Sequence, residues 1–246
     1  CGSNNSLQGC KTSRCSQFRS QKSHERLGYV RNSYRRKITG KRLVIKVGVL
    51  ELQGDFSLHH RVFSRLNIES IPVKVPLDLE SVDGLVIPGG ESTTLSLLID
   101  SFDLREPLIN FGKDHPVMGT CAGLIMMAKE VPDERVNPLG FLNICVDRNA
   151  YGRQIESSTE MVKYHFNSNT EIEFATTLIR APKISEMGDD IQVLGEFKGS
   201  PVAVISGHHL GLSFHPELDD IDLFHQILFD PSSNVYTKNL NQIYAT

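Results

Sequence analysis

One cysteine stands where it could act as a nucleophile. Between a short apolar strand and a helix, the chain has the G-x-C-x-G form of a nucleophile elbow, Gly119-Thr120-Cys121-Ala122-Gly123. Glycines on both sides allow a sharp turn, so we expect the thiol to project at the helix N-terminus. Unpaired N–H groups there favour thiolate over thiol and can hold an oxyanion. The alternative is a structural cysteine, because free cysteine is among the most buried residue types.

A nucleophilic cysteine needs a base, and the base needs an acceptor that orients it. His215-Pro216-Glu217 supplies both at the end of a predicted strand. Residues two apart on a strand face the same side, and proline favours an extended residue before it. We therefore expect Glu217 to hold the ring of His215 if the chain stays extended there. The alternative is a surface turn, because short motifs also occur by chance.

A loop of small residues, Gly89-Gly90-Glu91-Ser92, follows another predicted strand. Its glycines would let a backbone N–H approach an anionic intermediate, and Ser92 is the expected N-cap of the next helix. A plain strand-to-helix turn and a phosphate-binding loop are the alternatives, although the lysine of a P-loop is missing.

The elements that must position these motifs alternate between strand and helix. Apolar runs predict strands at 43–50, 71–75, 83–87 and in the elbow stretch 115–129, whose second part is expected to be helical. Helical spacing is found at 56–66, 95–102 and 106–113. This alternation indicates an α/β fold with a doubly wound, mostly parallel sheet. Sites in such sheets gather at the carboxyl ends of the strands, where Gln53, Gly90, Glu91 and Cys121 all fall.

The pattern changes after the elbow helix. Short apolar stretches at 141–146, 173–179, 191–197 and 202–205 predict an antiparallel extension. A last strand at 210–214 leads into His-Pro-Glu, and an amphipathic helix at 221–229 closes the domain. We expect one catalytic domain over residues 44–231 and a loose tail over 232–246.

Charge is unevenly distributed along the 246 residues. Residues 1–43 are rich in serine and hold eleven Lys or Arg against a single acid, Glu25, which predicts a disordered basic extension, or alternatively a transit segment. The rest of the chain holds 15 basic and 28 acidic residues, which argues against nucleic-acid binding. No apolar run is long enough to span a membrane.

Cysteine and histidine spacing gives no sign of a metal site. The five cysteines have neither metal-site nor disulfide-scaffold spacing, and three of them lie in the first fifteen residues, which favours a reducing compartment. The adjacent pairs His59-His60 and His208-His209 lack the i, i+4 spacing of helical ligands, and we expect them at the surface. Cys145 lies in an apolar stretch and is expected in the core.

Together these motifs resemble a class I (triad) glutamine amidotransferase, and specifically the glutaminase subunit of the two-protein pyridoxal 5′-phosphate synthase. The resemblance covers about residues 47–229 and is carried by Gly48–Phe56, Leu85–Thr94, Gly119–Gly123, Arg148–Gln154, Ile179–Pro182 and Phe214–Leu218. The elbow and His-Pro-Glu are shared across the superfamily. Gly-Gly-Glu-Ser-Thr-Thr, Arg-Asn-Ala-Tyr-Gly-Arg-Gln and Ile-Arg-Ala-Pro are typical of the subfamily. Residues 155–170 depart from its pattern, and we expect a loop there.

The resemblance implies a flavodoxin-like class I glutamine amidotransferase fold and a set of residue roles. Cys121 would attack L-glutamine, His215 would move the protons and Glu217 would orient His215. The implied oxyanion donors are backbone N–H groups of Gly90 and Ala122, with Gln53 organising the site when a partner docks. The implied glutamine-binding residues are Gly90, Glu91, Ser92, Arg148, Ile179 and Arg180.

The resemblance also implies a partner. Ammonia would pass to a separate (β/α)8-barrel synthase subunit, in a large hetero-oligomer, for the synthesis of pyridoxal 5′-phosphate; no cofactor or metal is implied for this chain. We expect a cytoplasmic protein, or a plastid protein if residues 1–43 direct import. The alternatives are the glutaminase subunit of another amidotransferase, an elbow-cysteine hydrolase or peptidase of the same broad fold, and a non-catalytic binding module.

Overall fold

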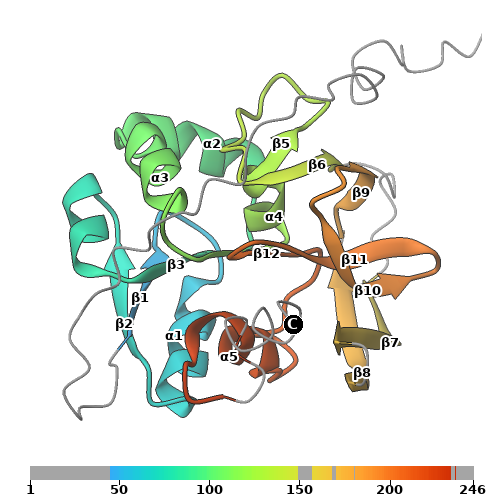
Figure 1. Ribbon diagram of the computed structural model, residues 1–246. Coiled ribbons are helices and arrows are strands. Elements are labelled where there is room, and N and C mark those ends of the chain that lie inside the picture. The colour runs from blue at the N-terminus through green and yellow to red at the C-terminus, as the bar shows by residue number, and fades with distance from the viewer. Residues whose placement is uncertain (1–44, 149–156, 168–169, 180, 234–235, 237–246) are drawn as a thin grey trace, which may run out of the picture. The chain divides into compact units, whose positions relative to one another are not determined.

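The computed structural model describes residues 45–148, 157–167, 170–179, 181–233 and 236. These residues form a central sheet of nine strands, in the order β2-β1-β3-β4-β12-β11-β10-β7-β8 (Figure 1). Its strands are β1 (Lys46–Leu50), β2 (Glu69–Val73), β3 (Gly84–Ile87), β4 (Val117–Thr120), β7 (Ser157–Asn167), β8 (Thr170–Ile179), β10 (Gln192–Phe197), β11 (Ser200–Ser206) and β12 (His209–Leu212). The helices are α1 (Phe56–Arg65), α2 (Ser92–Ser101), α3 (Arg105–Gly112), α4 (Ala122–Met127) and α5 (Leu223–Phe229), with a 3-10 helix at Pro76–Ser81.

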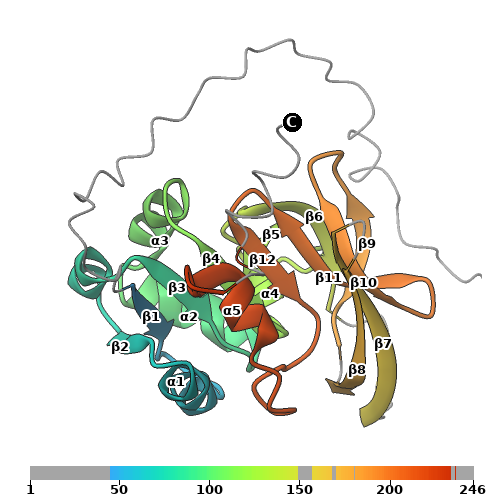
Figure 2. The ribbon, with the colours of Figure 1, turned by 60° about the horizontal axis from the view of Figure 1, so that its bottom comes forward.

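The sheet has a parallel half and an antiparallel half. The pairs β2-β1, β1-β3, β3-β4 and β4-β12 are parallel, whereas β12-β11, β11-β10, β10-β7 and β7-β8 are antiparallel. Figure 2 shows the antiparallel strands at one end of the sheet and the helices gathered over the parallel strands. The predicted α/β fold with an antiparallel extension is therefore confirmed.

Two stretches differ from expectation. The elbow helix was expected to continue to Lys129 but ends at Met127, because residues 128–130 form a strand, β5 (Ala128–Glu130), that pairs with β6 (Leu142–Asp147). With β9 (Lys183–Met187) they make a separate three-stranded sheet. The loop expected at 155–170 is wrong as well, because most of it is the long strand β7.

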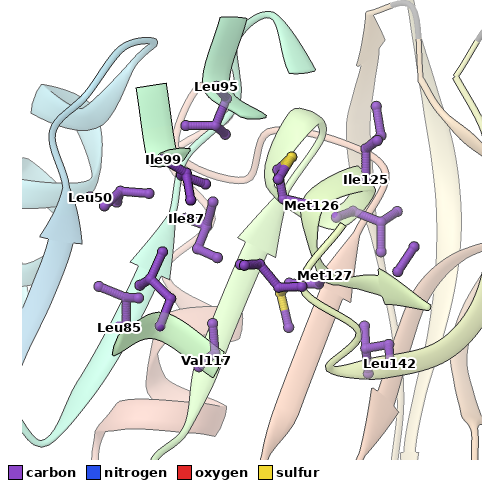
Figure 3. Packing of buried hydrophobic residues seen from close by; sticks show 14 of the residues in the cluster. Leu50, Leu85, Ile87, Leu95, Ile99, Val117, Ile125, Met126, Met127 and Leu142 are labelled. Carbon is purple, nitrogen blue, oxygen red and sulfur yellow. The ribbon is translucent and has the colours of Figure 1, made fainter. Parts of the chain in front are cut away.

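Helices cover both faces of the parallel half, and each face has its own hydrophobic core. On one face, α2, α3 and α4 pack on the sheet, with Leu95, Ile99 and Met126 against Leu85 and Ile87 (Figure 3). On the other face, α1 and α5 bring together the aromatic rings of Phe63 and Phe229, whose centroids lie 5.6 Å apart. Strands buried on both faces read as continuous apolar runs, which is why the sequence revealed them.

The predicted basic extension, residues 1–43, lies outside the described residues, as does most of the predicted tail. The domain boundaries at both ends therefore stay predictions. In the described part of the chain, no helix combines the length and the apolar character needed to cross a membrane.

Candidate active site

Cys121 occupies a strained corner between β4 and α4. Its backbone angles are φ 49° and ψ −102°, a conformation that residues with a side chain rarely adopt. The N–H of Cys121 donates a hydrogen bond of 2.8 Å to the carbonyl of Leu212 in β12. A Cβ atom on Gly123 would lie 2.0 Å from the carbonyl oxygen of Ile87, so only glycine allows this close approach. The elbow predicted from G-x-C-x-G is formed, and Cys121 is partly exposed.

His215 and Glu217 meet beyond the end of β12. His215 Nδ1 lies 2.8 Å from Glu217 Oε1, and both side chains are buried. An extended chain was expected there. Instead the chain turns, and the N–H of Leu218 donates a hydrogen bond to the carbonyl of His215. The turn folds the carboxylate back onto the ring. A Cβ atom on Gly89 would lie 2.1 Å from His215 Cε1, so the first glycine of the Gly89–Ser92 loop leaves room for this ring.

The charge of His215 is set by its two neighbours. Burial by itself lowers the pKa of His215, but side-chain hydrogen bonds with Cys121 and with Glu217 outweigh burial and raise that pKa to about 10. The imidazole is therefore protonated at neutral pH in the resting site, between the cysteine sulfur and a carboxylate. Two separate motifs, the elbow and His-Pro-Glu, thus supply three groups that interact, with His215 between Cys121 and Glu217.

The side-chain amide of Gln53 binds the loop Gly89–Ser92, which was predicted to donate an N–H group to the oxyanion. Gln53 Oε1 accepts the N–H of Glu91 at 3.2 Å, and Gln53 Nε2 donates to the carbonyl of Glu91 at 3.3 Å. Gly90 has φ 150°, and a Cβ atom there would lie 2.4 Å from Gln53 Nε2. Gln53 therefore packs directly against Gly90, and the two come together as the strand-end argument predicted.

Glu91, and not Ser92, caps helix α2. The carboxylate of Glu91 accepts the N–H groups of Thr93 at 3.1 Å and Thr94 at 2.6 Å, whereas Ser92 is the first residue of the helix. Partial burial raises the pKa of Glu91, but these N–H donors outweigh it and lower that pKa to about 2. The N-cap prediction was wrong by one residue because the longer carboxylate reaches the same free donors.

Arg148 joins this cluster. Its guanidinium donates to Ser92 Oγ at 2.9 Å and to Thr93 Oγ1 at 2.6 Å, and lies 3.6 Å from Glu91 Oε1. Its Nε lies 3.3 Å from Asp133 Oδ2. Asp133 was missed by sequence reasoning, because a lone acid in a loop carries no spacing signal. The structure thus brings Arg148, Glu91 and Ser92 together, with opposite charges side by side.

The last two predicted binding residues lie at the end of β8. Ile179 is half-buried and ends the strand, whereas Arg180 lies outside the described residues. Asp219, two residues after Glu217, accepts the backbone N–H of Thr177 at 2.7 Å and its hydroxyl at 2.6 Å. This second missed residue ties the turn that carries His215 and Glu217 to the strand that ends at Ile179.

The expectation of surface histidines was wrong for two of the four. His59 is completely buried, and His209 is only 9% exposed. His59 shares the buried face of α1 with Val62 and Phe63, a three- and four-residue spacing that could have revealed it. In the described part of the chain, no three His, Cys, Asp or Glu side chains are grouped so that they could hold a metal ion.

Comparison with known proteins places the fold of this chain in a class. A crystal structure of a glutamine amidotransferase superposes with a TM-score of 0.69 and 37% identity, covering 75% of this chain and 97% of that chain. The structure of PurLQS from Thermotoga maritima shares the fold alone, with a TM-score of 0.55 and 14% identity over 82% of this chain and all of that one. The fold is that of class I glutamine amidotransferases.

Curated relatives narrow the class to one family. The chain matches the SNO glutamine amidotransferase family over residues 49–230 and belongs to it. It is similar to pyridoxal 5′-phosphate synthase subunit PdxT of Shouchella clausii, with 45% identity over 185 residues, 74% of this chain and 92% of the relative. The PdxT of Thermotoga petrophila is 41% identical over 177 residues, 72% of this chain and 93% of the relative. The resemblance drawn from the motifs is confirmed.

Proposed function

We propose that this chain is the glutaminase subunit of a pyridoxal 5′-phosphate synthase, and that it hydrolyses L-glutamine to glutamate and ammonia for use by a synthase subunit. The observation that carries the proposal is that Cys121, His215 and Glu217 come together at the carboxyl ends of β4 and β12, with His215 hydrogen-bonded to Glu217 and its pKa raised by Cys121 and Glu217. The names of the relatives support the pathway.

The geometry suits hydrolysis through a thioester. The sulfur of Cys121 attacks the amide carbon of the glutamine side chain, and the carbonyl electrons move onto oxygen. As the C–N bond breaks, His215 gives its proton to the leaving nitrogen, and ammonia departs from a γ-glutamyl thioester. A water molecule, deprotonated by His215, then attacks the thioester carbon. The C–S bond breaks, glutamate is released, and thiolate and imidazolium are restored.

Two groups in the site can recognise the ends of an amino acid. Arg148 matches the substrate carboxylate and Glu91 matches the substrate ammonium, with Arg180 as the second candidate for the carboxylate. The 3.6 Å separation of Arg148 and Glu91 supports this assignment, because the carboxylate and the ammonium group of an amino acid are bonded to the same carbon. The backbone N–H groups of Gly90 and Ala122 are the proposed oxyanion donors.

Catalysis in this proposal depends on a partner. A (β/α)8-barrel synthase subunit, assembled with this chain in a large hetero-oligomer, would receive the ammonia. Gln53 supports the dependence on a partner, because a docked partner that moved Gln53 would also move the loop that contains Gly90. Gln53 is hydrogen-bonded to both the N–H and the carbonyl of Glu91 in that loop. Cytoplasmic and plastid locations both stay predictions.

Glutamate and ammonia release from L-glutamine tests the proposal, with the protein alone and with a pyridoxal 5′-phosphate synthase subunit added. We expect a strong rise on adding that subunit and loss of release in Cys121→Ala. Release that ignores the subunit would keep the triad but favour another amidotransferase. A folded protein that releases nothing under any condition would support the non-catalytic binding module instead.

A further inference from the structure

Two histidines that the mechanism does not use lie buried behind the triad. His59 on α1 and His225 on α5 are both completely buried. His59 Nδ1 lies 2.9 Å from His225 Nε2, and His59 Nε2 lies 3.5 Å from Glu217 Oε1. His59 Nε2 also lies 3.4 Å from the hydroxyl of Thr120, the residue before Cys121. A line of polar groups therefore leads from α5 through α1 to the triad carboxylate.

Both imidazoles are neutral at physiological pH. Burial lowers the pKa of His59 to about 3 and that of His225 to about 3. A neutral imidazole has one N–H donor and one lone pair, so each ring can exist as one of two tautomers. The contact between His59 Nδ1 and His225 Nε2 couples the choice, because one nitrogen must donate and the other accept.

Only one pairing of tautomers suits the surroundings. If His225 Nε2 donates to His59 Nδ1, the proton of His59 is on Nε2 and faces the oxygens of Glu217 and Thr120. The opposite pairing would turn the lone pair of His59 Nε2 towards a carboxylate. It would also leave an N–H at His225 Nδ1, a buried atom without a hydrogen-bond partner among the described residues. A buried donor without an acceptor is costly.

Glu217 has few other donors. Its side chain is fully buried, and its Oε2 atom has no hydrogen-bond partner among the described residues. A buried carboxylate keeps its charge and position only where donors or positive charge surround it. Donors face its Oε1 atom from two sides, His215 at 2.8 Å and His59 at 3.5 Å.

We propose that His59 is a positioning residue of the glutaminase, oriented by His225, and that its Nε2–H holds the Glu217 carboxylate where that carboxylate orients His215. Neither histidine touches the substrate. The inference rests on the proposed glutaminase activity and adds two helices, α1 and α5, to the elements on which the turnover rate depends.

Two substitutions at one position test the direction of the N–H. The glutamine amide nitrogen can reach the place of Nε2, so His59→Gln keeps a donor towards Glu217 but removes the acceptor for His225. The shorter asparagine amide matches Nδ1, so His59→Asn keeps the contact with His225 and removes the donor towards Glu217. The two variants therefore separate the catalytic contact from the structural one.

We expect His59→Asn to lower kcat on the order of tenfold to hundredfold, with KM for glutamine nearly unchanged, because the glutamine-binding residues are untouched. His59→Gln should keep kcat within a few-fold of the native protein. His209→Asn is the matched control, because His209 is also buried, stacks on Phe141 and begins strand β12 at the end away from the triad. It should leave kcat unchanged.

A kcat of His59→Asn equal to that of His59→Gln would overturn the proposal, as would an equal loss in His209→Asn. Imidazole 15N NMR of the native protein gives a test without any variant: both rings should be neutral with the proton on Nε2, and a proton on Nδ1 of His59 would contradict the proposal. If the native protein, with its synthase subunit, released no glutamate, the proposed function would fail first. A normal native rate with equal variants would sink only this inference.

Discussion

The two halves of the central sheet contribute unequally to the candidate site. The parallel half ends in the elbow of Cys121 and lies beside the turn of His215 and Glu217, and its strands have only four or five residues. The antiparallel half has strands of six to eleven residues but contributes only Ile179 among the described site residues. The half with the shorter strands therefore supplies more of the site residues than the half with the longer strands.

Topology explains the difference. Parallel strands all end at the same edge of the sheet, so the loops that follow them meet there. In an antiparallel hairpin, successive turns fall at opposite edges, so only one end of each pair can reach a given site. The antiparallel half therefore acts on the site through a connection, the hydrogen bonds of Asp219 to Thr177.

The largest expected effect compares the cysteine of the elbow with a cysteine of the smaller sheet. Cys121→Ala should lower glutamate release by at least about 10⁴-fold, because it removes the nucleophile. Cys145→Ala, in strand β6 of the smaller sheet, should keep kcat, since this buried cysteine lies outside the triad. Glutamate release by both purified variants, with unfolding curves to show that each is folded, measures the contrast. A loss of kcat in folded Cys145→Ala would contradict the expectation that only Cys121 is needed for glutamate release.

Two glycines give the next contrast, in stability. A Cβ atom on Gly123 would meet the backbone carbonyl of Ile87 at 2.0 Å, whereas a Cβ atom on Gly188 would meet the end of the Asn143 side chain. Gly123→Ala should lower the free energy of unfolding by about 3 kcal/mol or more, because backbone cannot move aside. Gly188→Ala should cost about 1 kcal/mol or less, because a side chain can rotate. Urea unfolding compares them, and equal losses would contradict this reading.

The charge of His215 predicts a dependence of stability on pH. Its pKa is raised from 6.5 when unfolded to about 10 in the fold, so the folded state binds this proton more tightly. The resulting stabilisation is fully present below pH 6.5 and is lost as the pH rises to about 10. The difference in free energy of unfolding between the native protein and His215→Asn should shrink over this range. A difference that grows with pH would contradict the assigned charge.

The smallest effect should come from the connection between the halves. Asp219→Ala frees the strand that ends at Ile179 from the turn that carries His215 and Glu217, so KM for glutamine should rise several-fold while kcat stays within about threefold. Asp190→Ala is the control, because Asp190 accepts hydrogen bonds from Asn143 in β6 and Ser206 in β11. Steady-state kinetics of both variants measure these changes. Equal KM values for Asp219→Ala and native protein would show that Asp219 does not influence glutamine binding.

The same contrast explains what the sequence could predict. The parallel strands are buried on both faces and stand out as apolar runs, and the triad lies in short motifs at their ends. Strand β7 was missed although Val162, Tyr164 and Phe166 alternate with exposed residues, because Met161 and His165 obscure the period of two.

Contacts across the fold were beyond the sequence. Asp133, Asp219 and His225 join the site only because distant segments meet, and nothing in their local pattern marks them. His59 is a different case, because the helical spacing of its buried neighbours was visible and adjacency to His60 was given too much weight. The turn at Leu218 could not be foreseen either, since proline is compatible with both an extended chain and a turn.

The most direct test of the account is to trap the covalent intermediate. The protein, with its synthase subunit, is mixed with L-glutamine, quenched in acid within the first turnover, digested and analysed by mass spectrometry. We predict one γ-glutamyl group on the peptide that contains Cys121, and none on the peptide that contains Cys145. Turnover without an adduct on Cys121, or an adduct on another residue, would contradict the assignment of Cys121 as the nucleophile.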